Sequence, residues 1–187
     1  MNKHHKEVEV RFLEIDKGPF LKKLADLGAQ DLGEDLLEEI IFYDKGLRWQ
    51  DDKKFVRLRK QKNQAFLTYK NHASETADGT EEIEFEVSDM VKAEHFLERL
   101  GFMAYRHQQK LRHTFKLGRV LIEIDRWPRI PTYVELEGES EEDLKAAASQ
   151  LDLDWNEVVF ENARIIIENK YNIPVGNMKW FTFDKFE

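Results

Sequence analysis

The segment Glu7-Val8-Glu9-Val10-Arg11-Phe12 alternates charged and apolar side chains over the length of one β-strand. In a strand, side chains two positions apart lie on the same face. This segment therefore has one face made of charged groups and another made of apolar groups. The same arrangement recurs along the chain, and it decides which fold the sequence predicts.

Later strand candidates repeat this alternation, and each carries charged groups of one sign on its polar face. In chain order these groups are Arg57 and Arg59; Lys70; Glu82, Glu84 and Glu86; Lys110 and Arg112; Glu123 and Asp125; Glu135 and Glu137. An amphipathic sheet with its charged face in water explains any one of these strands. Over all of them, the segregation by sign favours a sheet that closes, so that the charged face lines its inside.

The segments between these strands predict helices. Asp16 is the expected cap of a helix that stops near Gly28, and Ser88 is the expected cap of a second helix. Short connections favour antiparallel pairing. We therefore predict an α+β fold, a closed eight-stranded antiparallel β-barrel with helices packed outside. Residues 1–187 are expected to form a single domain, in which 140–187 is a C-terminal helical and aromatic extension that packs on the barrel.

Composition excludes several classes of function. The chain has 187 residues, 41% of them hydrophobic and 12% aromatic, which is enough for one core. It has no cysteine, which excludes disulfides, thiolate zinc sites and cysteine nucleophiles. The net charge of −8 argues against general nucleic-acid binding. Neither a signal peptide nor an apolar run of membrane-spanning length is evident, so we expect a cytoplasmic protein that does not engage membranes.

A lumen lined by the alternating charges needs a ligand, because burying like charges together is strongly unfavourable without counter-ions. Carboxylates bind hard divalent cations such as Mg²⁺ or Mn²⁺. Arginine and lysine bind anions that offer several oxygens. A polyphosphate chelated to Mg²⁺ or Mn²⁺ pairs with both sets at once, and the residues alone predict such a ligand.

The order of the charged doublets resembles the CYTH superfamily, the triphosphate tunnel metalloenzymes, over most of the chain. Glu7-Val8-Glu9-Val10-Arg11 is similar to the family's ExExK signature, and the doublets from Arg57-Leu58-Arg59 to Glu135-Leu136-Glu137 follow in the family's order. One position departs from the pattern, because Arg11 stands where the family usually has lysine. This puts in doubt any role that needs a compact or deprotonatable amine there.

The resemblance implies an antiparallel eight-stranded tunnel, a small-molecule triphosphate substrate and dependence on a divalent metal. By position, it implies that the metal ligands are Glu7, Glu9, Asp125, Glu135 and Glu137. It implies that the triphosphate is bound by Arg11, Arg57, Arg59, Lys70, Lys110 and Arg112. Glu84, Glu86 and Glu123 are expected to support or join the metal site. The residues expected to act in catalysis are Glu7, Glu9, Arg11 and Lys110.

The resemblance leaves the reaction open, because the family includes thiamine, inorganic and RNA triphosphatases as well as class IV adenylyl cyclases. We favour metal-dependent hydrolysis of inorganic tripolyphosphate, thiamine triphosphate or a nucleoside triphosphate. The alternative is a class IV cyclase that converts ATP to cyclic AMP and pyrophosphate. Such cyclases often carry a His-Phe pair before the first strand, where this chain has His4-His5 and no following Phe. A non-catalytic polyphosphate or nucleotide binding module is a lesser alternative, and we expect a monomer or homodimer.

Overall fold

The computed structural model of the chain describes residues 6–72 and 80–187, with side chains over 8–71 and 81–187. Within these residues the strands are β1 (Lys6–Phe12), β2 (Gln30–Asp44), β3 (Lys54–Gln61), β4 (Gln64–His72), β5 (Thr80–Val87), β6 (Phe102–Leu117), β7 (Val120–Arg126), β8 (Tyr133–Gly138) and β9 (Trp180–Phe181). The helices are α1 (Lys17–Asp26), α2 (Arg48–Asp51), α3 (Met90–Arg99), α4 (Glu141–Gln150) and α5 (Ala163–Tyr171), with 3-10 turns η1 (Trp155–Glu157) and η2 (Val175–Asn177).

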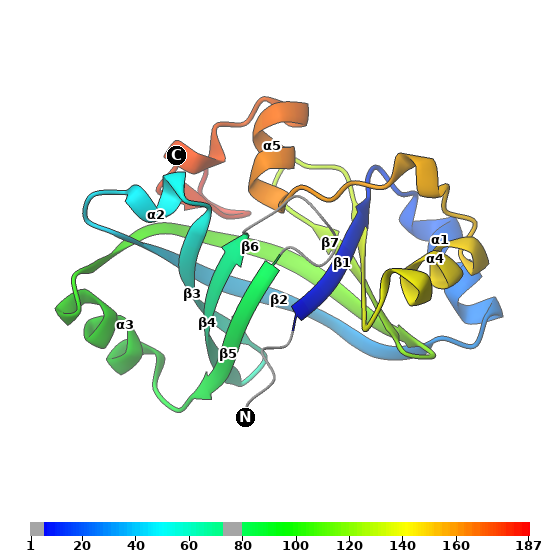
Figure 1. The fold of residues 1–187 in the computed structure, drawn as a ribbon, viewed down its shortest axis with the longest axis horizontal. Coiled ribbons are helices and arrows are strands. Elements are labelled where there is room, and N and C mark those ends of the chain that lie inside the picture. Colours follow the sequence, from blue (N-terminus) through cyan, green and yellow to red (C-terminus); the bar gives the residue numbers. More distant parts are fainter. Residues whose placement is uncertain (1–5, 73–79) are drawn as a thin grey trace.

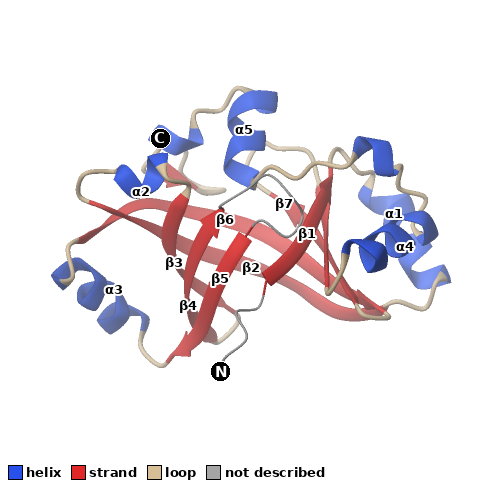
Figure 2. Ribbon diagram, viewed as in Figure 1, coloured by secondary structure: helices blue, strands red, loops and turns tan. Residues whose placement is uncertain are grey.

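All strands belong to one strongly curled sheet (Figure 1). Their spatial order is β2-β3-β4-β5-β1-β8-β7-β6-β9, and β2 also pairs with β6. Strands β1 to β8 pair antiparallel, whereas the short β9 runs parallel to β6. The two longest strands, β2 and β6, pair from Gln30 with Lys116 to Asp44 with Phe102. This long pair runs along one side of the curled sheet, and β1, β3, β4 and β5 lie in front of it in Figure 2.

The predicted α+β fold with an eight-stranded antiparallel sheet is confirmed, but its full closure is not. Strands β1 and β5 meet only where Lys6 pairs with Glu81 and Glu7 with Thr80. Beyond these residues β5 pairs with β4 and β1 pairs with β8, so the sheet is open along most of this edge. The reason lies in the C-terminal part of the chain. The backbones of Arg11 and Val159 exchange two hydrogen bonds of 2.9 Å, which occupy an edge of β1 that a closed barrel would give to β5.

The apolar faces of the strands form the main core with helices α1 and α4. Val10, Ile122 and Leu136 are fully buried, and Leu24 of α1 and Leu144 of α4 pack in the same cluster. As predicted, Asp16 caps α1, because its carboxylate accepts a hydrogen bond from the Gly18 amide at 3.1 Å. The alternation of the strands thus directs the apolar side chains outward, under the helices, and the charged side chains inward.

Two helix boundaries differ from those expected. The cap of α3 is Asp89, one residue after Ser88, since the Asp89 carboxylate accepts from the Lys92 amide at 3.0 Å. Within the extension 140–187, which was expected to be helical, residues 155–171 are divided into η1 and α5. The division arises because Val159 is extended where it pairs with β1, so that α5 starts only after its cap Asn162.

The C-terminal segment packs on the sheet through a second apolar cluster. Ile167 of α5, Val175 of η2 and Phe181 of β9 are buried together with Trp127 and Tyr133, which lie at the ends of β7 and β8. Figure 1 shows α5 and the C-terminus together on one side of the sheet. Among the described parts of the chain, none of the helices is long and apolar enough to span a bilayer.

The buried position of one leucine and the exposed position of another give a direct test of this core. Leu136 of β8 is fully buried, whereas Leu36 of β2 is 39% exposed. We expect Leu136→Ala to lower the free energy of unfolding by about 2–5 kcal/mol, because it leaves a cavity in the core. Leu36→Ala, the matched control, is expected to cost less than about 1 kcal/mol. Urea unfolding of both variants checks this, and equal losses would contradict the core described above.

Candidate active site

The charged faces of the strands enclose a cavity of about 630 Å³, which is large enough for a nucleotide-sized ligand. The C-terminal segment contributes to its wall through Ala163, Ile167 and Val175. Most of the residues predicted from the alternation meet in this one cavity. They are Glu9, Arg11, Arg57, Arg59, Lys70, Glu82, Glu84, Lys110, Arg112, Glu123, Glu135 and Glu137.

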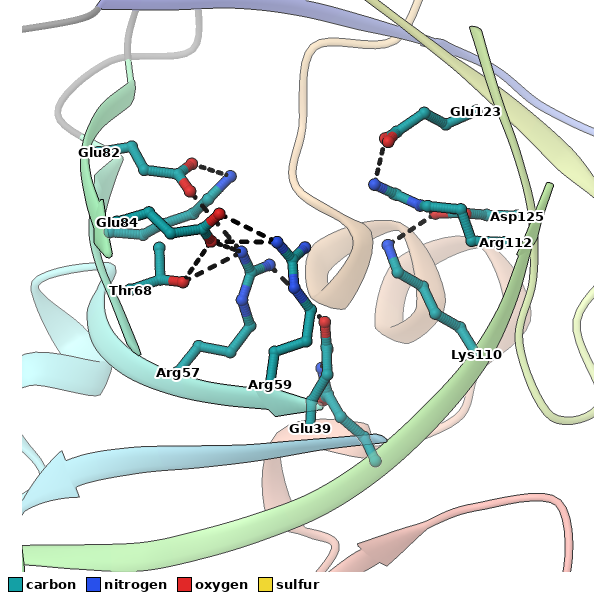
Figure 3. A network of polar contacts seen from close by, with 12 residues as sticks. Glu39, Arg57, Arg59, Thr68, Glu82, Glu84, Lys110, Arg112, Glu123 and Asp125 are labelled. Atoms are coloured by element: carbon teal, nitrogen blue, oxygen red, sulfur yellow. Dashed lines mark hydrogen bonds and ion pairs between the residues drawn. The ribbon is translucent and has the colours of Figure 1, made fainter. Parts of the chain in front are cut away.

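One side of the cavity is formed by β3, β4 and β5, and its central group is the carboxylate of Glu84 (Figure 3). Arg59 Nη2 lies 3.1 Å and Arg57 Nη2 3.3 Å from Glu84 Oε2, and Thr68 Oγ1 donates to the same oxygen at 2.6 Å. Nearby, Lys70 Nζ lies 2.6 Å from Glu82 Oε2. We call these five residues, Arg57, Arg59, Lys70, Glu82 and Glu84, the arginine cluster.

The two arginines of the arginine cluster are compensated unequally. Burial alone would lower the pKa of Arg57, but Glu39, Glu82 and Glu84 outweigh it and raise that pKa. Burial, together with the neighbouring charge of Arg57, lowers the pKa of Arg59. Arg57 Nε and Arg59 Nε are buried and have no hydrogen-bond partner within residues 6–72 and 80–187. A buried N–H without a partner costs free energy, and a ligand that brings acceptor oxygens into the cavity would remove that cost.

The opposite side of the cavity is formed by β6, β7 and β8, where Asp125 holds two cations (Figure 3). Asp125 is fully buried, and its Oδ2 accepts from Lys110 Nζ at 2.7 Å and from Arg112 Nη2 at 2.6 Å. Arg112 also pairs with Glu123 and Glu135. Burial alone would raise the pKa of Glu135, but Arg11, Lys110 and Arg112 outweigh it and hold that pKa well below its ordinary value.

Arg11, on β1 next to β8, uses every nitrogen of its guanidinium. Nε donates to Glu135 Oε1 at 2.6 Å, Nη2 lies 2.9 Å from Glu9 Oε1, and Nη1 donates to the carbonyl of Glu161 at 3.0 Å. Burial alone would lower the pKa of Arg11, but Glu135 and Glu9 raise it well above its ordinary value. This guanidinium is therefore a fixed cation whose donors are already taken.

Three buried polar residues of the long strands were missed by the sequence analysis. Gln108 Nε2 donates to Glu39 Oε2 at 2.6 Å, and Arg106 Nε donates to Gln108 Oε1 at 2.8 Å. Arg106 and Gln108 continue the two-residue spacing of Lys110 and Arg112. The alternation of the strand could therefore have placed both side chains on its polar face. No such pattern marks Glu39 in the sequence, because the residues from Leu36 to Tyr43 do not alternate between polar and apolar.

Glu39 is a buried carboxylate that stays ionised. Burial alone would raise its pKa, but the charges of Arg57, Lys110 and Arg59 outweigh burial and lower the pKa to about 2. Arg57 Nη1 lies 3.7 Å from Glu39 Oε1. Glu39 thus offsets part of the positive charge of Arg57 and Arg59.

Some predicted residues are placed away from the cavity. Glu86 is exposed and accepts from Gln64 Nε2 at 3.2 Å, beyond the end of the lumen. Asp125 lies behind Lys110 and Arg112 and does not line the cavity. The backbone of Glu7 pairs in β1, but its side chain lies outside the described residues, as do His4 and His5.

The carboxylates that remain can be tested for their fit to a metal ion. Glu9, Glu123, Glu135 and Glu137 line the same cavity and offer only oxygen ligands, which suits Mg²⁺ or Mn²⁺. In the described residues, however, no three acidic or histidine side chains are already gathered around one point. Arg11 and Arg112 hold Glu9 and Glu135 in the positions seen. The donor chemistry therefore fits a hard cation, and the carboxylates must exchange partners to bind it.

Comparisons with known proteins identify the family and the fold. The sequence profile described as "CYTH domain" matches residues 5–162. A relative from Methanocaldococcus jannaschii, named "Putative adenylate cyclase MJ0240", is 26% identical over 132 residues, which are 70% of this chain and 75% of the relative.

Solved structures show the same fold. The PH1012 protein from Pyrococcus horikoshii OT3 has a TM-score of 0.72 at 25% identity, and the match covers 83% of this chain and 96% of that one. A protein from Vibrio parahaemolyticus, named "putative adenylate cyclase", has a TM-score of 0.76 over 89% of this chain and 99% of that one. Its identity is 17%, so this likeness concerns the fold alone.

The low pKa of Glu39 leads to a prediction about stability and pH. Because the folded-state pKa of about 2 lies below the ordinary value of 4.5, ionised Glu39 stabilises the fold above that value, and this contribution disappears as pH falls toward 2. We expect Glu39→Gln to lower the free energy of unfolding by about 3 kcal/mol at pH 7. The difference from the parent protein should narrow between pH 4.5 and 2.

Glu38→Gln is the matched control for this measurement. Glu38 is the neighbouring residue and makes an exposed pair with Lys60 at 3.2 Å. Its substitution should change the free energy of unfolding by less than about 1 kcal/mol at any pH. Denaturant unfolding at several pH values provides the data, and a loss in Glu39→Gln that does not vary with pH would refute the assignment.

Proposed function

Because the chain belongs to the CYTH domain family, we propose that its cavity binds a triphosphate and that the protein hydrolyses it. The observation that carries this proposal is the pair of buried Nε groups of Arg57 and Arg59, which have no acceptor among the described residues. The side chains of Arg57 and Arg59 lie across from those of Lys110 and Arg112 (Figure 3). Phosphoryl oxygens are the acceptors that such forked donors fit best.

A triphosphate would replace carboxylates as the partner of these cations. Arg57, Arg59 and Lys70 would bind it from one side, and Lys110 and Arg112 from the other. We propose that Asp125, expected to bind metal, instead fixes the direction of Lys110 and Arg112, because it is fully buried behind them. Cations fixed in this way need no rearrangement as charge develops in the transition state.

We propose that Glu9, Glu135 and Glu137 would hold Mg²⁺ or Mn²⁺, joined by Glu7, which the family resemblance implies as a metal ligand. Such an ion, when bound, neutralises phosphate charge and polarises the phosphoryl group. Glu84 pairs with Arg59 and Glu123 pairs with Arg112, two of the basic residues proposed to bind the triphosphate. These two carboxylates would keep the net charge of the site low. Glu86 has no part in the proposal, since it lies outside the cavity.

In the proposed reaction, water attacks the terminal phosphorus in line with the bridging oxygen. The bond from phosphorus to that oxygen breaks, a cavity carboxylate takes the proton of the water, and inorganic phosphate is released. The cations of both sides bind the non-bridging oxygens and stabilise the charge that moves onto the leaving diphosphate. We further propose that residues 1–187 act as one domain, because 140–187 supplies Ile167 and Val175 to the cavity wall.

A cyclase is the second candidate, and the name of the Methanocaldococcus jannaschii relative favours it. In that reaction the ribose 3′-hydroxyl attacks the α-phosphorus, and pyrophosphate leaves. The cavity also has apolar wall residues, Ile41, Phe55 and Ile167, against which an organic group could pack. The hydrolase is preferred because it needs only the charged residues already described.

A panel of substrates distinguishes these candidates. With Mg²⁺ or Mn²⁺, we expect phosphate release from at least one of tripolyphosphate, thiamine triphosphate, ATP and GTP, measured colorimetrically. Cyclic AMP with pyrophosphate from ATP, measured by chromatography, would replace the hydrolase with the cyclase. Tight binding without any product would leave a binding module and contradict both enzymatic proposals.

A single carboxylate substitution tests the proposed metal site. Glu135→Gln keeps the shape of the side chain but removes the charge that a divalent cation needs. We expect kcat to fall by at least about 100-fold, in keeping with the loss of a metal ligand. Glu141→Gln, in an exposed pair with Lys145 on α4, is the control and should keep full activity. Full activity in Glu135→Gln, measured across a range of Mn²⁺ concentrations, would place the metal elsewhere.

A further inference from the structure

Arg11 differs from Arg57 and Arg59 in how its donors are used. Arg112 is also paired at every guanidinium nitrogen, but all of its partners are carboxylates of β7 and β8, whereas Arg11 also donates to the backbone of the segment before α5. Its Nε, Nη1 and Nη2 each have a partner at 2.6 to 3.0 Å. Arg57 and Arg59 each keep a buried Nε without a hydrogen-bond partner in the described chain. Arg57 and Arg59 share the Glu84 carboxylate and keep unused donors, whereas Arg11 would have to release a buried partner at every nitrogen to bind a new anion.

The partners of Arg11 come from three separate parts of the fold. Glu9 lies on the same strand, Glu135 lies on β8, and the Glu161 carbonyl belongs to the segment that leads into α5. The backbone of Arg11 also exchanges two hydrogen bonds with Val159. One residue thus connects two candidate metal ligands to the C-terminal segment through both its backbone and its side chain.

From these contacts we propose that Arg11 is a positioning residue and not a triphosphate ligand. It is the internal counter-ion that holds Glu9 and Glu135 in place, and it fixes both of them to the C-terminal segment. This inference rests on the proposed metal site and gives Arg11 a role different from the one that the family resemblance implies. It also accounts for arginine at this position, because three acceptors in different directions suit a planar fork and not a single ammonium.

The proposal has a consequence for metal binding. A divalent cation that binds Glu9 and Glu135 has to share their oxygens with a guanidinium that already pairs with both. Removing that guanidinium should make the metal bind more tightly, because the competing cation is gone. The carboxylates would at the same time lose their fixed direction, so turnover should fall.

The test compares Arg11→Gln with Arg59→Gln. We expect Arg11→Gln to tighten Mn²⁺ binding without substrate by about tenfold, measured by calorimetry, which corresponds to one charge-assisted hydrogen bond. Its kcat for the best substrate of the panel should fall, with KM changed less than about threefold. Arg59→Gln should give the reverse pattern, a KM at least about tenfold higher with Mn²⁺ affinity unchanged. Arg48→Gln, in an exposed pair with Asp44, should match the parent protein in both.

The proposal is overturned if Arg11→Gln behaves like Arg59→Gln, with a raised KM and unchanged Mn²⁺ affinity. Circular dichroism and thermal unfolding show whether the variant folds. If it does not, Arg11→Lys keeps the charge but cannot reach all three partners, and we then expect a lower kcat with KM retained. A raised KM with kcat retained in Arg11→Lys would equally overturn the proposal.

Failure of the proposed function can be told apart from failure of this inference. If the parent protein turns over no triphosphate, the Mn²⁺ titrations of the parent and Arg11→Gln still report on competition for Glu9 and Glu135. Tighter Mn²⁺ binding in the variant would then support the inference in a protein that is not a triphosphatase. Equal Mn²⁺ affinities in a catalytically active protein would reject the inference and leave the proposed function standing.

Discussion

The structure depends on one electrostatic constraint, which is that charged side chains buried inside a sheet must be paired. Cations on β3 lie opposite acids on β5, and cations on β6 lie opposite acids on β7 and β8. Each pairing offsets a desolvation cost that neither partner could bear alone. The apolar helices outside the sheet are compatible with this lumen because every strand turns one face to each side.

The two walls of the cavity differ in how completely their hydrogen-bond donors and acceptors are paired, and this difference bears on how the cavity would bind an anion. Around Asp125 and Arg11 the donors and acceptors are saturated, and the charges there hold one another in place. In the arginine cluster, Arg57 and Arg59 share the carboxylate of Glu84. The buried Nε group of each arginine has no hydrogen-bond partner among the described residues. A triphosphate that bridges the two walls would meet unused donors of Arg57 and Arg59 on one wall and would displace carboxylates on the other. The saturated wall holds its cations in fixed directions before the ligand arrives.

Much of the fold and of the site could be predicted from strand periodicity, because a two-residue repeat directly reports which side chains share a face. The identities of Arg57, Arg59, Lys110 and Glu135 as cavity residues follow from it. Glu39 could not be found in this way, since its neighbours are charged or apolar without alternation. Nor could periodicity show that Asp125 lies behind the cations, or that Val159 takes the edge of β1. Both depend on contacts between distant parts of the chain.

The hydrogen bonds between Arg11 and Val159 also affect how fast the fold can form. Apart from two residues that pair with β5, β1 pairs with β8 and with Val159, which lie far from it in the sequence. Contacts of such long sequence separation slow folding, because a large loop has to close before they form. We therefore expect β1 to be among the last strands to join the sheet during folding.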